Sequence, residues 1–337
     1  MPKRKKNFSL GKIIFWLFLL IFAWILITHF GQTKQIIFVL TTGKWYWVGL
    51  AILFQLFYYP FYSFFCESIF SIFRVDFKRR HILPVYLASK FTDVALPIAT
   101  FGQLAVFVRH GKKHDLSPIN VGIGISFVLF SEVLAFLGIS LIVLLTLYFF
   151  GDNRVYLWLP LLILAVVLVS VIVFLLRLAV YHIPPNRFVL WIIRHLAKIG
   201  GQKTVTHDDL EKIFLEIGAD LQTNKKKIIP GLLFALTTHL INLATLFFVC
   251  LAFVGHVNIL AVLAGYVACL LFTIVSITPQ GVGVAEAVMI ATLRSFGMDL
   301  SEAAVVTLAF RGLLYWLPLF AGFYAFEKLE WDRHHAQ

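Results

Sequence analysis

Charged residues are scarce in this chain, and their scarcity excludes most classes of soluble protein. Asp, Glu, Lys and Arg together supply 14% of the 337 residues, whereas 60% of the residues are hydrophobic. A soluble domain is typically about 45–50% apolar and about 25% charged. Several apolar runs also reach the roughly 20 residues that one membrane-spanning helix needs. The composition therefore predicts an all-α polytopic membrane protein.

Cysteines and enzyme motifs are also few. The three cysteines, Cys66, Cys250 and Cys269, stand in apolar runs without CxxC spacing, which indicates small buried side chains rather than a metal site or disulfides. No GxSxG, HExxH or P-loop motif occurs. The one sizeable polar segment is shorter than a typical nucleotide-binding domain, because domains usually exceed about 50 residues. We therefore expect no catalytic residues, no cofactor and no bound metal.

Basic residues outnumber acidic ones, and this excess points to a membrane rather than to nucleic acid. The chain has 29 Lys and Arg against 17 Asp and Glu, a net charge of +12. The cations cluster in predicted loops, which is typical of the positive-inside bias of membrane proteins. They would also attract anionic lipid headgroups, by about 1 kcal/mol each. The expected partner is an anionic membrane surface.

The N-terminus resembles a signal peptide without its cleavage site. Basic residues from Lys3 to Lys6 precede an apolar run from Ile13 to Ile27, but no small-x-small site follows. This pattern predicts an uncleaved first span with a cytoplasmic N-terminus.

Hydropathy and loop charge predict six membrane spans and two interrupted helical hairpins. The spans are expected at residues 12–29, 45–73, 117–150, 155–178, 228–253 and 303–326. Pro and Gly break two further apolar runs, 83–108 and 259–296, which we interpret as hairpins entering from the cytoplasm and from outside, respectively. Whether they are re-entrant or fully spanning stays open. Both termini are expected in the cytoplasm.

Residues 181–227 form the sizeable polar segment. Apolar side chains at helical spacing, such as Leu210, Ile213, Phe214 and Ile217, predict two amphipathic helices on the cytoplasmic membrane surface. A linker that packs on the helix bundle explains the same pattern.

The order of elements repeats with opposite orientation. Residues 12–150 and 155–330 each give two spans, a hairpin and a span, which is the arrangement of inverted transporter repeats. Asp115-Leu116-Ser117 follows the first hairpin and Asp299-Leu300-Ser301 the second, although Asp-Leu-Ser also recurs by chance as a helix cap. We expect one transmembrane domain over 1–337, built of these two halves.

The sharpest local motif is Pro279-Gln280-Gly281-Val282-Gly283-Val284-Ala285-Glu286. Gly281 and Gly283 permit close backbone approach and unusual dihedral angles. A half-helix that starts at this break would point free N–H groups into the membrane, where they attract phosphate. Glu286 is then either a partner of the helix dipole or a buried acid paired with Arg311.

Ionisable side chains within spans are costly, by about 2.5–3.5 kcal/mol on insertion scales, and usually functional. Arg311 lies in the middle of the last predicted span, and its candidate partners are Glu286 and Glu132. Lys90 and Asp93, three residues apart, either neutralise one another or serve function. The residues expected to bind substrate are Glu286, Arg311, Glu132, Gly281, Gly283, Pro279 and Arg109.

At these residues the chain resembles the lysylphosphatidylglycerol synthase transmembrane region, a flippase-like family. The P-x-G-x-G-x-x-E stretch, Arg311, Tyr315-Trp316-Leu317-Pro318 and Gly322 carry the resemblance, which extends roughly from Lys12 to Glu330. The first half departs from the family pattern L-P-x-x-x-G-E-x-x-R.

Leu96-Pro97 match that pattern, but Gly102 comes one residue late and Gln103 replaces the acid. Arg109 substitutes for the arginine from one turn further on, and Glu132 alone remains of a later E-R-x-x-D pattern. These departures bear on which headgroup is recognised.

The resemblance implies a flippase for an aminoacylated or other anionic phospholipid, or for a lipid-linked precursor, in a bacterial cytoplasmic membrane. It also suggests a tie to cationic-peptide resistance. The soluble domain that transfers lysine to phosphatidylglycerol in the full-length synthases is expected to be absent here. The alternatives are a lysyltransferase or the membrane subunit of a separate synthase or glycosyltransferase, and an anchor or regulator. A homo-oligomer stays open.

Overall fold

The computed structural model describes residues 33–95, 99–150, 166, 169–170, 173, 207–276 and 278–335. Within these residues the chain is helical and has no β-strand. The predicted span at 12–29 and the first of the two predicted amphipathic helices lie outside them, as does almost all of the predicted span at 155–178.

Four helical stretches are long and apolar enough to cross a membrane. They are α3 (Trp45–Phe70), α6 (Pro118–Phe150), α10 (Lys225–Phe253) and the stretch Leu300–Phe326. The last combines α13 (Leu300–Arg311), a short π-helical turn η3 (Gly312–Trp316) and the start of α14 (Leu317–His335). All four coincide with predicted spans. The chain is therefore a multi-pass, all-α membrane protein.

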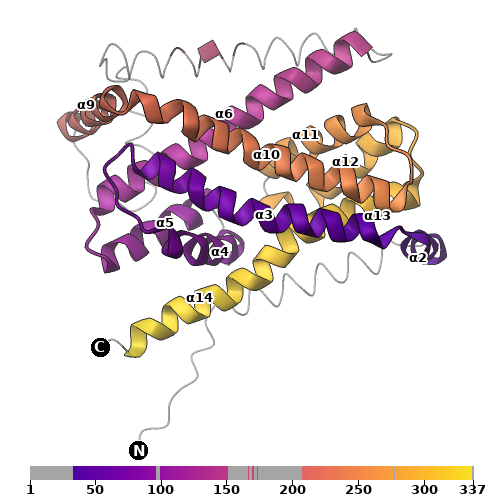
Figure 1. The fold of residues 1–337 in the computed structure, drawn as a ribbon, viewed down its shortest axis with the longest axis horizontal. Helices are drawn as coiled ribbons and strands as arrows, with labels where there is room; N and C mark the ends of the chain where they lie inside the picture. The colour runs from indigo at the N-terminus through magenta and orange to yellow at the C-terminus, as the bar shows by residue number, and fades with distance from the viewer. Residues whose placement is uncertain are drawn as a thin grey trace, which may run out of the picture.

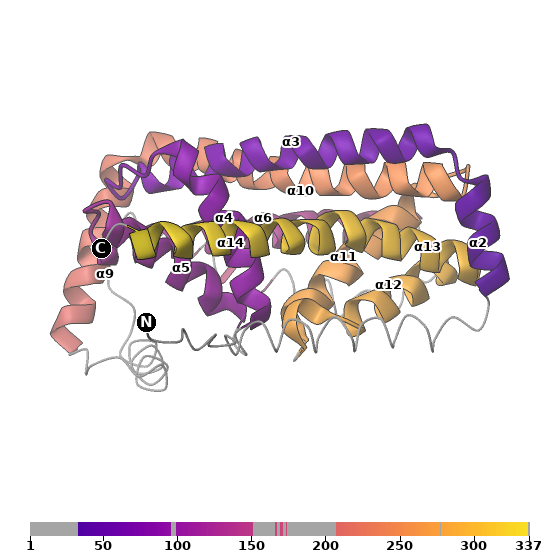
Figure 2. The ribbon, with the colours of Figure 1, turned by 90° about the horizontal axis from the view of Figure 1, so that it is seen from below.

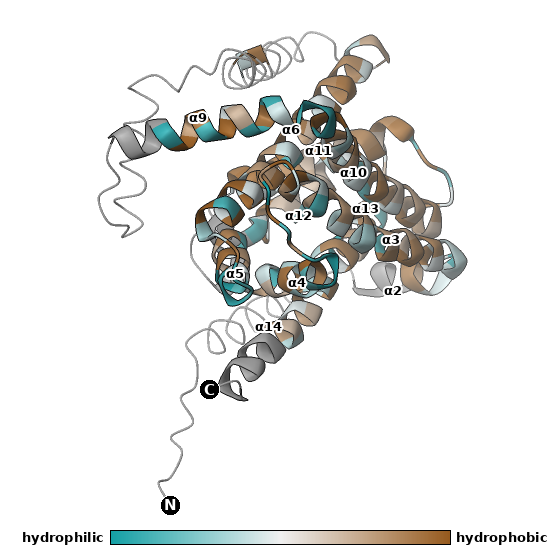
Figure 3. Ribbon diagram, turned by 60° about the vertical axis from the view of Figure 1, so that its left-hand side comes forward, coloured by the Kyte–Doolittle hydropathy of each residue, from teal (hydrophilic) through white to brown (hydrophobic). Residues whose placement is uncertain are grey.

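The long helices carry apolar side chains on their outer faces, as a lipid environment requires. Leu56 and Phe57 of α3, Ile142 of α6 and Ile229 of α10 are all exposed. Figure 3 shows the long helices as mostly hydrophobic, whereas hydrophilic and hydrophobic residues alternate along α9 (His207–Thr223).

Helices α3 and α10 lie side by side along most of their length (Figure 1). Figure 2 shows these two helices as one layer, with the two hairpins side by side on the other face of the molecule. Helix α14 packs along α4 (Arg79–Ala95), and α2 (Thr33–Thr42) packs against α13 at one end.

Two helical hairpins occupy the places where the sequence predicts them. The first consists of α4 and α5 (Ala99–Lys113), and the second of α11 (Ile259–Val275) and α12 (Val284–Ser295). These helices have 17, 15, 17 and 12 residues, fewer than the roughly 20 that one span needs. Helix α4 contacts the break in the second hairpin, η2 (Pro279–Gly281), so the two hairpins meet inside the molecule.

The two Asp-Leu-Ser triplets adopt different local structures. Asp115 has a left-handed backbone with φ of 58° and ends α5, whereas Asp299 is the extended residue that caps α13. After the second hairpin a left-handed residue comes two positions before Asp299, at Gly297, with φ of 89°. The triplet therefore gives the inverted repeat no structural support, and the repeat remains a prediction.

Each hairpin is surrounded by a buried hydrophobic cluster. The first cluster joins α3, α4, α5, α6 and α10 through residues such as Phe65, Phe70 and Phe107. The second joins α10, α11, α12 and α13 through residues such as Tyr266 and Phe310. The three cysteines are buried without disulfides, as the sequence predicts.

Helix α9 packs on the helix bundle through its apolar face. Ile217 and Leu221 are buried in the first cluster, and Arg74 pairs with Asp220 at 3.1 Å. This arrangement favours the linker alternative for the described part of the polar segment, because the apolar stripe is covered by protein.

Candidate functional site

A cavity of about 470 Å³ lies between the two hairpins. Residues of both hairpins line it, together with residues of α3, α6, α10 and the stretch from α13 to α14. Its polar and charged lining residues are Gln55, Tyr58, Tyr59, Tyr86, Lys90, Gln103, Glu132, His239, Asn242, Thr273, Ser276, Thr278, Gln280, Arg311 and Tyr315. Polar groups are costly inside a bilayer unless they face water, a ligand or one another, so this lining marks the candidate site.

A buried ion pair forms one wall of the cavity. The Nε atom of Arg311 donates to Oε1 of Glu286 at 2.7 Å, and the two residues are only 5% and 8% exposed. The Arg311 guanidinium also lies over the ring of Tyr315, 4.9 Å from its centroid. Burying two charges is unfavourable unless hydrogen bonds satisfy both of them, and here they do.

The break between α11 and α12 is shaped to receive the arginine. Gln280, Gly281 and Gly283 all have positive φ, of 53°, 68° and 86°. This backbone turns the Gln280 carbonyl toward Arg311, whose Nη2 atom donates to it at 2.9 Å. A β-carbon on Gly281 would come within 2.7 Å of the Thr273 backbone, whereas one on Gly283 would meet nothing.

Glu286 fulfils both roles that the sequence left open. While Oε1 binds Arg311, Oε2 accepts a hydrogen bond from the Gly283 N–H at 2.7 Å and so stabilises the start of α12. One N–H group of the predicted phosphate site is therefore already bound by the protein's own carboxylate. An anionic ligand in the cavity would therefore meet the cationic side chains of Lys90 and Arg311 rather than this N–H group.

The lining from α3, α4 and α6 carries Lys90, Glu132 and a network of tyrosines. The Tyr58 and Tyr86 hydroxyls lie 3.0 Å apart, and the Lys90 ammonium lies 4.9 Å from the centroid of the Tyr86 ring. Gln103 donates to the Tyr62 hydroxyl at 2.6 Å. These contacts tie α3 to both helices of the first hairpin.

His239 of α10 connects two neighbouring helices. Its Nδ1 atom lies 2.8 Å from the Tyr266 hydroxyl of α11, and its Nε2 atom lies 3.0 Å from the backbone carbonyl of Glu132 in α6. These contacts make His239 a hydrogen-bonding link between α6, α10 and α11. The bond to the Glu132 backbone also fixes the turn of α6 that presents the glutamate to the cavity.

The structure brings together some of the predicted substrate-binding residues but not all. Arg311 and Glu132 line the cavity, Glu286 lies directly behind Arg311, and Gly281 and Gly283 form the break.

Arg109 is exposed toward the end of α5 and does not line the cavity. The side chains of Pro279 and Asp93 lie outside the described residues. The sequence left open whether Lys90 neutralises Asp93 or serves function, and it did not single out the tyrosines. Their signal was the spacing of Tyr58 and Tyr62, one turn apart on the same helix face.

Comparison with known proteins agrees with the resemblance seen in the motifs. The family model described as "Lysylphosphatidylglycerol synthase TM region" matches residues 10–322. The UPF0104 membrane protein MJ1595 of Methanocaldococcus jannaschii is 31% identical over 99 residues, which are 29% of this chain and 30% of that protein. The matched segment thus spans less than a third of that relative. The family match, by contrast, includes both hairpins and the cavity between them.

Proposed function

The chain belongs to the lysylphosphatidylglycerol synthase TM region family, and from this membership and the polar cavity we propose that it translocates lipids across a bacterial cytoplasmic membrane. The observation that carries the proposal is the cavity itself. It holds Lys90, Glu132 and Arg311 inside a protein whose outer helix faces are apolar.

The size of the cavity suits a lipid headgroup. Pockets of about 300–1,000 Å³ hold small molecules, and this cavity has about 470 Å³. A headgroup fits such a volume, whereas a pair of acyl chains does not. In the proposed path the headgroup passes between the hairpins while the acyl chains stay in the bilayer.

The charges of the cavity suit a headgroup that bears both signs. Lys90 offers an ammonium for a phosphate, and Glu132 offers a carboxylate for an amine. Arg311 is held by Glu286 and Gln280, so it serves mainly to fix the wall and its positive potential. An aminoacylated phospholipid such as lysylphosphatidylglycerol carries a phosphate and amines, and we propose this class as the substrate.

The test is lipid transfer in proteoliposomes that contain the purified full chain. Fluorescent phosphatidylglycerol, its lysylated form and a lipid-linked precursor are each placed in both leaflets, and an impermeant quencher measures what reaches the outer leaflet. We expect protein-dependent transfer, fastest for the lysylated lipid. Transfer no faster than in protein-free liposomes for all three lipids would overturn the proposal.

A further inference from the structure

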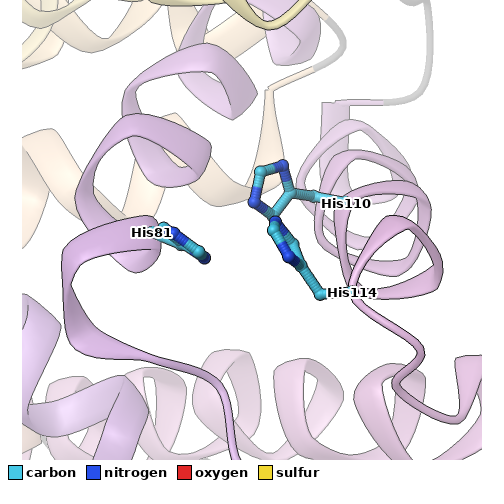
Figure 4. A group of neighbouring side chains, drawn as sticks. All are labelled: His81, His110 and His114. Atoms are coloured by element: carbon cyan, nitrogen blue, oxygen red, sulfur yellow. The ribbon is translucent and has the colours of Figure 1, made fainter. Parts of the chain in front are cut away.

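Three histidines gather at the basic end of the first hairpin, away from the lipid cavity. His81 comes from α4, His110 from α5 and His114 from the turn that follows α5. One ring nitrogen of each histidine lies within 4.8 Å of the corresponding nitrogens of the other two. Figure 4 shows the rings converging from the two sides of the hairpin. The ring centroids of His81 and His110 each lie within 5 Å of His114, at 4.5 and 4.7 Å.

Local structure fixes the backbone of all three residues. His81 is the third residue of α4, and its N–H binds the Lys78 carbonyl at 2.9 Å. His110 and His114 are four residues apart, so the turn that follows α5 places His114 on the same side as His110. The turn at His114 is closed by a hydrogen bond from the Leu116 N–H to the Gly111 carbonyl at 3.1 Å, with left-handed Asp115 between them.

His110 is held by the core and lacks a hydrogen-bond partner for one nitrogen. Its ring stacks on buried Phe77, with centroids 5.9 Å apart. Its Nε2 atom is buried and, among the described residues, has no hydrogen-bond partner. A buried nitrogen without a partner is unfavourable, and a metal ion would satisfy it.

We propose that His81, His110 and His114 bind one transition-metal ion of the Zn²⁺ class, which joins α4 to α5. Three neutral imidazoles suit Zn²⁺, Cu²⁺ or Ni²⁺, whereas Mg²⁺ and Ca²⁺ prefer carboxylate and carbonyl oxygens. Zinc nitrogen bonds of about 2.0–2.1 Å would place the nitrogens about 3.3 Å apart. The ligand nitrogens lie up to 4.8 Å apart at present, so they would move closer together on binding.

The surrounding charge determines what completes the coordination sphere. Lys78 and Arg80 act on His81, and Lys113 acts on His110, so the site lies in a positive field. This field weakens binding of a bare cation and favours an anionic fourth ligand, such as a phosphate or carboxylate oxygen. The three histidines leave the fourth tetrahedral position open for it.

The sequence predicts no metal site, because local spacing does not reveal this cluster. The spacing of His110 and His114 supplies two ligands at most, and only the packing of α4 against α5 adds His81. The proposal stands apart from lipid translocation, because these histidines do not line the cavity.

The experiment uses the full chain in detergent, purified through an affinity tag without histidines and stripped of metal. Calorimetric titration with Zn²⁺ should give one site per chain. His110→Ala should weaken binding at least tenfold, whereas the exposed His256→Ala, at the far end of α10, should bind as the wild type does. A wild type that binds no Zn²⁺, or a His110→Ala variant that binds equally well, would overturn the proposal.

A second measurement uses the wild-type protein, so its outcome does not depend on whether a variant folds. Diethyl pyrocarbonate modifies accessible histidines, and mass spectrometry assigns the modified sites. Zn²⁺ should protect His81 and His114 but not His256, and Mg²⁺ should protect none of them. Equal reactivity of His81 and His114 with and without Zn²⁺, or equal protection by Mg²⁺, contradicts the assignment.

Discussion

At the scale of single residues, the ion pair between Arg311 and Glu286 organises the second hairpin. It links α13 to the start of α12, and Arg311 adds a hydrogen bond to the Gln280 carbonyl of the break. Removing one member of a buried pair leaves the other charge uncompensated, at a cost of about 3–5 kcal/mol.

Glu286→Met and Arg311→Met should therefore each lower the thermal unfolding midpoint in detergent strongly. The double variant should lose less stability than the sum of the two single losses, because neither charge is left alone. It should stay below the wild type, since the Gln280 carbonyl loses its donor. Additive losses in this double-mutant cycle would show that the pair is not coupled.

Gly281 and Gly283 offer a second comparison between neighbouring residues. Both have positive φ, which costs a residue with a side chain about 1–2 kcal/mol. Only at Gly281 does a β-carbon also meet the Thr273 backbone. We expect Gly283→Ala to lose about 1 kcal/mol of stability and Gly281→Ala clearly more, as measured by thermal unfolding. Equal losses of stability would mean that the close approach of the Thr273 backbone to Gly281 does not add to the cost of the alanine side chain.

The sequence predicted these residues better than it predicted their contacts. Glycines in an apolar run indicate a break, and an arginine within a span requires an acid, so both features follow from local rules. The choice of Glu286 over Glu132 as the partner depends on how α12 packs on α13, which no local rule supplies.

At the scale of elements, the close approach of α14 and α4 holds the last span against the first hairpin. Side-chain hydrophobicity drives helix association weakly in lipid, so small residues that allow close backbone contact matter more. Gly322 is such a residue, because a β-carbon there would overlap the Leu87 carbonyl oxygen.

Gly322→Leu should accordingly destabilise the protein by about 1–3 kcal/mol through overpacking. Gly138→Leu on α6 is the matched control, since a β-carbon at Gly138 meets nothing within 4 Å. Thermal unfolding of the two variants compares their losses of stability. If Gly138→Leu lost as much stability as Gly322→Leu, the contact with Leu87 would not explain the effect.

Among the described residues, the long helices followed from hydropathy to within a few residues, whereas α2 (Thr33–Thr42) was not predicted. The predicted spans at 45–73, 117–150 and 228–253 correspond to α3, α6 and α10. The last span was predicted as one helix, but a π-helical turn at residues 312–316 interrupts it directly after Arg311. Hydropathy cannot predict such a turn, because a π-bulge changes the backbone hydrogen bonding without changing the composition.

At the scale of the whole molecule, the proposed function depends on how the two hairpins enclose a polar space. Composition predicted a membrane protein, and broken apolar runs predicted the hairpins. Their meeting at α4 and the break at 279–281 is a tertiary contact that the sequence did not reveal. For this reason the role of Lys90 was left open and the tyrosines were missed, although they lie on the same cavity as Glu132 and Arg311.

The most direct test of the central claim is the transfer of lysylated phosphatidylglycerol by cavity variants in proteoliposomes. Lys90→Met and Glu132→Gln remove one charge each from the cavity. Lys226→Met and Glu216→Gln remove the same charges from exposed positions and serve as matched controls. We predict that both cavity variants slow transfer at least tenfold while the controls transfer as the wild type does. Unchanged transfer in folded Lys90→Met and Glu132→Gln would contradict passage of the headgroup between the hairpins.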